Sequence, residues 1–121
     1  PLFTYVVKQL AQLNLAYIHI IEGATGGPRE IEDRPFDYEA LKAAYRQAGG
    51  KGAWMVNNGY DKPLADEAVK EGDDLVAFGK PFISNPDLVR RLRENAPLNE
   101  LDKATMYGGG AKGYTDYPAL G

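Results

Sequence analysis

The stretch DLVAFGKPFISNPDLVRRLR, residues 74–93, decides how the rest of this chain is interpreted. Its apolar run at 75–78 has the length and composition of a buried parallel strand. Gly79 and Lys80 follow at once, and a glycine lets the backbone approach a ligand closely because it has no Cβ. The Asn-Pro-Asp run at 85–87 then predicts the start of a helix, with the asparagine as N-cap. Together these features favour an anion, most simply a phosphate; the alternative is a plain βα loop with a solvated lysine.

The same strand-turn-helix pattern occurs three times along the chain, and it predicts an α/β fold. The predicted order is a helix over 3–13, a strand over 15–21, a helix capped by Asp37, a strand over 53–56, a helix from Asp61 to Gly72, and the opening stretch. Strands that alternate with helices at this spacing form right-handed βαβ units and a parallel sheet. Three strands are too few for a doubly wound sheet or a closed barrel, so we expect part of a larger domain.

Composition narrows the class of protein. The chain has 121 residues, 44% hydrophobic and 26% charged, with a net charge of −3 and no basic stripe, so nucleic acid is not an expected partner. It has no cysteine and one histidine, which excludes disulfides and thiolate metal sites and disfavours a histidine-based metal cluster. We expect no membrane partner, because no stretch has the length of a membrane span. The missing cysteines and signal peptide fit a cytoplasmic protein.

Four stretches resemble the Old Yellow Enzyme family of FMN-dependent ene-reductases, of the N-ethylmaleimide reductase type. They are YIHIIEGATGGP at 17–28, NNGYD at 57–61, DLVAFGKPFISNPDLVRRL at 74–92 and MYGGGAKGYTDYP at 106–118. The resemblance implies that residues 1–121 are an incomplete C-terminal segment of one (β/α)8 TIM-barrel domain. The segment would contain strands six to eight and a closing tail at 98–121.

The resemblance also implies site residues. The cofactor would be FMN, with its phosphate held at the turns after two strands by Asn58, Gly59, Gly79 and Lys80. Relatives often have arginine at the position of Lys80, and many have a small residue at the position of Asn58. Tyr107 and Thr25 would line the substrate side of the flavin. No catalytic residue is expected in this segment, because the family's tyrosine proton donor and the pair that binds the substrate oxygen lie upstream.

The implied activity is reduction of activated alkenes (enones, nitro compounds and maleimides) with NADPH or NADH as hydride donor. Whether this segment is itself an enzyme stays open, and we expect it to be inactive alone. One alternative is a catalytically inactive barrel fragment that self-associates or pairs with a missing N-terminal portion. A third reading is a different phosphate-binding α/β protein.

Several other residues invite a functional interpretation but have simpler ones. His19, in the middle of a strand, is more simply a barrel histidine with a hydrogen-bond partner than a catalytic group. Trp54 and Met55 are expected in the core. The arginines at 90, 91 and 93 are most simply a solvated helix face. Glu22, at the end of a strand, is a positional candidate for a site residue without a visible acid-base partner.

Overall fold

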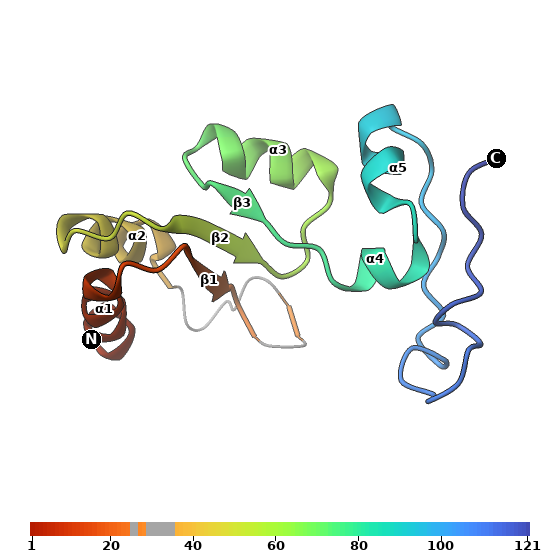
Figure 1. The fold of residues 1–121 in the computed structure, drawn as a ribbon, viewed down its shortest axis with the longest axis horizontal. Helices are drawn as coiled ribbons and strands as arrows, with labels where there is room; N and C mark the ends of the chain where they lie inside the picture. Colours follow the sequence, from red (N-terminus) through yellow and green to blue (C-terminus); the bar gives the residue numbers. More distant parts are fainter. Residues whose placement is uncertain (25–26, 29–35) are drawn as a thin grey trace. The chain divides into compact units, whose positions relative to one another are not determined.

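The computed structural model describes residues 1–24, 27–28 and 36–121. By its internal contacts the chain divides into two compact units, Pro1–Ala77 and Phe78–Gly121. The first unit contains a parallel sheet with its helices, and the second contains two short helices and the C-terminal tail (Figure 1).

The first unit follows the predicted alternation of helices and strands. Its elements are α1 (Leu2–Leu10), the 3-10 helix η1 (Ala11–Leu13), β1 (Tyr17–Ile21), α2 (Tyr38–Gln47), β2 (Ala53–Asn57), α3 (Lys62–Lys70) and β3 (Leu75–Val76). The sheet order is β1-β2-β3 with both pairs parallel, and Tyr17 lies opposite Ala53 while Met55 lies opposite Leu75. The predicted parallel sheet is therefore confirmed, although β3 is shorter than the apolar run at 75–78.

Two helices of this unit begin where the sequence predicts, because an aspartate caps each of them. Asp37 accepts a hydrogen bond from the backbone N–H of Ala40 at 2.8 Å, and Asp61 accepts one from Leu64 at 2.9 Å. Each bond satisfies one of the backbone donors that a helix start leaves without a partner. α3 also carries a proline in its first turn, a position that tolerates the missing N–H.

The core lies on the face of the sheet that α2 and α3 cover. Trp54 and Tyr45 are both 1% exposed, and their rings pack 5.7 Å apart between centroids. Gly52 lies against the same ring, since its N–H donates to the Tyr45 hydroxyl at 3.1 Å. A Cβ at Gly52 would lie 2.5 Å from the carbonyl oxygen of Leu15, so this approach requires glycine. The prediction of Trp54 as a core residue is confirmed.

The opposite face of the sheet is uncovered within the described part of this unit. Tyr17, Ile21 and Leu75 are 54%, 49% and 44% exposed, whereas Ile18 and Val56, which face the helices, are buried. The apolar runs predict buried strands, and the structure buries only the side chains on the face that the helices cover. Runs of apolar residues indicate strands suited to burial on both sides, but a three-stranded unit has helices for only one.

Charged side chains connect α2 to the turn between α3 and β3. The ammonium of Lys42 lies 2.7 Å from Asp73 and 3.0 Å from Glu39. Burial lowers the pKa of Lys42, but the two carboxylates outweigh it and hold the pKa above its usual value. Asp74 accepts from the backbone N–H of Trp54 and pairs with Arg46, each at 2.7 Å. These contacts fix the register in which the chain enters β3.

The second unit differs from the prediction at Asn85. The helices are α4 (Lys80–Ser84) and α5 (Leu88–Glu94), so Asn85 lies between them and does not open a helix. Its fully buried side chain donates to the carbonyl of Pro81 and accepts from the N–H of Asn99. The side-chain oxygen that would cap a helix is thus used to hold the tail, and the prediction of Asn85 as N-cap is wrong.

Arg91 is a second correction in this unit, because it is 4% exposed and not part of a solvated face. Its guanidinium pairs with Asp87 at 2.7 Å and donates to the carbonyls of Pro97 and Pro118. The other carboxylate oxygen of Asp87 accepts from the N–H of Leu120 at 2.8 Å. One arginine therefore holds two separate segments of the tail against α5.

Candidate functional site

The carboxyl ends of the strands lie at one edge of the sheet, where barrel and doubly wound enzymes place their sites. Beyond the paired residues the ladder continues, since Glu22 N–H donates to Asn57 at 3.0 Å and Ala77 N–H donates to Val56 at 2.9 Å. The turn after β2 and the chain leaving β3 therefore start from the same edge. This is the edge at which the sequence places the phosphate-binding turns.

The turn after β2 has an unusual backbone. Asn58 has φ of 109° and Gly59 has φ of 69°, both in the left-handed region that favours glycine. The Asn58 side-chain amide donates to the carbonyl of Glu22 at 2.6 Å and, more weakly, to that of Ala24 at 3.4 Å. The side chain of Asn58 therefore connects two loops, which its sequence position does not reveal.

Gly79 and Lys80 lie at the start of the second unit. Gly79 has an ordinary φ of −99°, and a Cβ added there would meet nothing within 4 Å. Lys80 is the first residue of α4 and is exposed, and no described residue forms an ion pair or hydrogen bond with its ammonium. The carbonyl of Gly79 accepts from the N–H groups of Phe82 and Ile83 at the start of α4, so the ligand-binding role predicted for Gly79 concerns its N–H and the space beside it.

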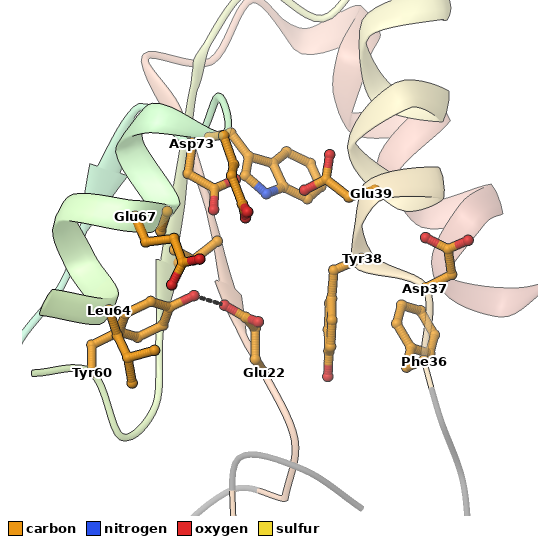
Figure 2. A pocket seen from close by; sticks show the side chains of 13 residues that line it. Glu22, Phe36, Asp37, Tyr38, Glu39, Tyr60, Leu64, Glu67 and Asp73 are labelled. Carbon is orange, nitrogen blue, oxygen red and sulfur yellow. Dashed lines mark hydrogen bonds between the residues drawn. The ribbon is translucent and has the colours of Figure 1, made fainter.

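Glu22 has the partner that sequence analysis did not find. The Tyr60 hydroxyl donates to its carboxylate, and both residues are buried. Both side chains line a cavity of about 320 Å³, together with residues of α2, β2 and α3. Figure 2 shows the Glu22–Tyr60 pair on one side of this cavity and the Tyr38 ring beside Glu22. The Tyr38 hydroxyl accepts from Gly23 N–H at 2.6 Å. Glu22 is thus held by its neighbours and is no longer a candidate for an isolated acid.

This cavity is acidic but is not a metal site within the described residues. Six carboxylates line it, from Glu22, Asp37, Glu39, Glu67, Glu71 and Asp73. The parts of the chain that the structure describes contain no group of three His, Cys, Asp or Glu side chains with metal-binding geometry.

Over the same residues, no helix has both the length and the apolar character of a membrane span.

Three further predicted residues have different outcomes. His19 lies on the uncovered face of the sheet, where its Nε2 is 2.9 Å from Oδ1 of Asn57 on the neighbouring strand, so it has a hydrogen-bond partner as expected. Tyr107 is 86% exposed in the tail of the second unit. Thr25 lies outside the described residues. The assignment of Tyr107 and Thr25 to the substrate side stays a prediction.

Known proteins with similar sequences are named as 12-oxophytodienoate reductases. 12-Oxophytodienoate reductase 7 of Oryza sativa subsp. japonica is 41% identical over 119 residues, covering 88% of this chain and 28% of the relative. The 12-oxophytodienoate reductase-like protein of Solanum lycopersicum is 36% identical over 121 residues, covering 98% of this chain and 31% of the relative. The chain thus spans about a third of the length of these curated relatives.

The fold agrees with this likeness. The old yellow enzyme homologue from Zymomonas mobilis, NCR, superposes with a TM-score of 0.85 at 36% identity, over 98% of this chain and 32% of that protein. The three-stranded α/β unit is accordingly similar to part of a TIM barrel, and the third reading, an unrelated phosphate-binding protein, is set aside. The family model for NADH:flavin oxidoreductases and NADH oxidases matches residues 3–99. The chain therefore belongs to the NADH:flavin oxidoreductase / NADH oxidase family.

Proposed function

We propose that this chain supplies the FMN-phosphate end of an NAD(P)H-dependent ene-reductase that acts on activated alkenes such as enones, nitro compounds and maleimides. In this proposal residues 1–121 are strands six to eight of the barrel, with residues 98–121 as its closing tail. The observation that carries it is the common carboxyl edge of β2 and β3, from which two glycine-containing turns leave the sheet. Membership of the family supplies the class of cofactor and reaction.

The residues present fit the phosphate of FMN. Backbone N–H groups at Asn58 and Gly59 belong to a turn with two positive φ values, a type of backbone found in anion-binding loops. The open space around Gly79 leaves room for a phosphate oxygen, and the Lys80 ammonium supplies a charge that no described residue neutralises. These residues would bind and orient the cofactor. When bound, FMN supplies the hydride for the alkene.

Lys80→Ala tests this assignment through the phosphate alone. The affinities of the chain for FMN and for riboflavin, which lacks the phosphate, are measured by quenching of flavin fluorescence. One exposed charge–phosphate contact contributes about 1 kcal/mol, so we expect about fivefold weaker FMN binding and no change for riboflavin. Lys8→Ala, which removes an exposed lysine of α1, is the matched control. Equal FMN affinity in both variants would count against Lys80 as a phosphate ligand.

Turnover is tested after the chain is combined with the portion of the Zymomonas mobilis NCR that this chain does not match, which in this proposal is N-terminal. We expect the mixture to turn yellow with FMN and to oxidise NADPH in the presence of an enone, because the upstream portion supplies the catalytic residues. The chain without that portion should give no turnover. A mixture that binds FMN and stays inactive would refute the proposed assembly.

The uncovered face of the sheet supports a second candidate, a catalytically inactive fragment that pairs with another copy or with a complementary barrel segment. Tyr17, Ile21 and Leu75 on this face are all more than 40% exposed, and the outer edges of β1 and β3 have no strand partner in the described residues. Sedimentation velocity over a hundredfold range of concentration tests self-association. A chain that stays monomeric over this range would exclude pairing with another copy.

A further inference from the structure

The side chain of Asn58 has a role that a backbone phosphate ligand does not need. Its φ of 109° lies where glycine is favoured, so an asparagine here holds a strained backbone. Strain of this kind persists only where the surrounding structure compensates for it. The compensation is visible, because the side-chain amide donates to the carbonyls of Glu22 at 2.6 Å and Ala24 at 3.4 Å.

These bonds belong to a set that we call the Glu22 clamp, formed by Glu22, Asn57, Asn58 and Tyr60. The N–H of Glu22 donates to the carbonyl of Asn57, its carbonyl accepts from the Asn58 side chain, and its carboxylate accepts from the Tyr60 hydroxyl. The N–H, the carbonyl and the carboxylate of Glu22 are thus all bound by the turn at residues 57–60. Glu22 and Tyr60 are buried and Asn58 is half-buried, so water competes poorly for these bonds.

The loop after β1 is itself braced next to the clamp. The carbonyl of Ala24 also accepts from Gly27 N–H at 2.8 Å, and Ala24 N–H donates to the carbonyl of Pro28 at 3.0 Å. Gly23 N–H donates to the Tyr38 hydroxyl of α2. The Asn58 amide therefore bonds to carbonyls of Glu22 and Ala24, whose described neighbours have further hydrogen bonds, and these bonds hold the backbone of the turn after β2.

We propose that Asn58 is a positioning residue, whose side chain holds the turn after β2 in the backbone conformation that presents its N–H groups to the FMN phosphate. This inference rests on the proposed function, because it needs a phosphate at that turn. A preorganised turn loses less conformational freedom on binding than a mobile one, and the gain is specific to the group that the turn contacts. The side chain would raise affinity for the phosphate of FMN without touching it.

Asn58→Gly tests the proposal, because glycine adopts the same φ without strain and removes both side-chain bonds. We expect amide hydrogen exchange at residues 22–24 to rise about fivefold. FMN affinity should fall about tenfold, a loss of about 1.4 kcal/mol, while riboflavin affinity stays constant. Asn58→Asp, which keeps the size of the side chain and loses the donor, should weaken FMN binding at least as much. Asn14→Gly, at another asparagine with positive φ (51°), is the matched control. It should change neither the ratio of FMN to riboflavin affinity nor the amide hydrogen exchange at residues 22–24.

The ratio of FMN to riboflavin affinity separates positioning from a general structural role. A loss of affinity that is equal for both flavins, or an unchanged ratio in Asn58→Gly, would overturn the proposal while leaving the proposed function in place. Unchanged exchange at residues 22–24 would overturn it as well. Failure of the unsubstituted chain to prefer FMN over riboflavin would overturn the proposed function, and this inference with it.

Discussion

Arg91→Met is the substitution for which the structure predicts the largest local effect in the second unit. Methionine keeps much of the apolar length of the side chain but removes every donor. The carbonyls of Pro97 and Pro118 then lose their bonds to the buried guanidinium. Bonds to a charged donor contribute about 1.5–3 kcal/mol each. We use the lower value, because both prolines are exposed and water can replace part of the loss, and so expect about 3 kcal/mol for the two bonds.

Amide hydrogen exchange measures this loss where it occurs. The N–H groups of Leu120 and Asn99 bond to side chains near Arg91 and report on the attached tail. A loss of about 3 kcal/mol should speed their exchange about a hundredfold. Arg90→Met is the matched control, since Arg90 is half exposed and, among the described residues, pairs with Glu94 on the helix surface and with the carbonyl of Gly121. Its effect should be about tenfold or less. Equal exchange in the two variants would refute the buried role of Arg91.

Three further outcomes follow from the same geometry. The N–H of Leu120, and then Arg91, lower the pKa of Asp87. The stabilisation is therefore fully present above the pKa of this carboxyl in the unfolded chain and is lost as pH falls through its lower pKa in the folded chain. Protection of the Leu120 amide should be constant from pH 7 to 5 and decline below about pH 4. Protection that persists unchanged at pH 3 would contradict this. Gly52→Ala should lower the free energy of unfolding in urea by about 1–3 kcal/mol, because its Cβ would lie 2.5 Å from the carbonyl oxygen of Leu15 in the segment before β1. Gly79→Ala, in open space, should leave the urea midpoint unchanged and weaken FMN binding; a lowered midpoint would show that this glycine has a structural role.

Local signals in the sequence predict the fold of the first unit well. The caps at Asp37 and Asp61 act within three residues of their partners, and the apolar runs that become β1 and β2 are continuous. The core position of Trp54 follows from the same runs. Each of these features depends on neighbouring residues alone, which is why pattern and spacing are sufficient to find it.

The contacts that sequence analysis could not predict all join residues far apart in the chain. Asn85 has the sequence of a helix cap, but its oxygen accepts from a residue 14 positions later. Arg91 lies between two exposed arginines, yet it bonds to Pro118, 27 positions away. The Asn58 amide reaches a carbonyl 36 positions back. A single sequence carries no signal for such pairs, because the polar residue is chemically suited to water as well.

The sequence predicted which turns form the candidate site, but not their backbone angles or side-chain contacts. The sequence placed Asn58 and Gly59 after a strand, and the structure adds their positive φ values and the clamp on Glu22. For Gly79 and Lys80 it adds exposure and the absence of a described partner. Their joint action on one phosphate stays a prediction, which the affinity ratios above test.

The uncovered face of the sheet affects how the melting temperature of this chain is interpreted. A complementary segment that binds only the folded form raises its apparent melting temperature by mass action, and the rise grows with the logarithm of that segment's concentration. Because Tyr17, Ile21 and Leu75 expose large apolar side chains on this face, their burial is the free energy that such a segment would gain. We therefore expect the melting temperature of this chain to depend on the concentration of any segment that covers this face, and a melting curve to need that concentration stated.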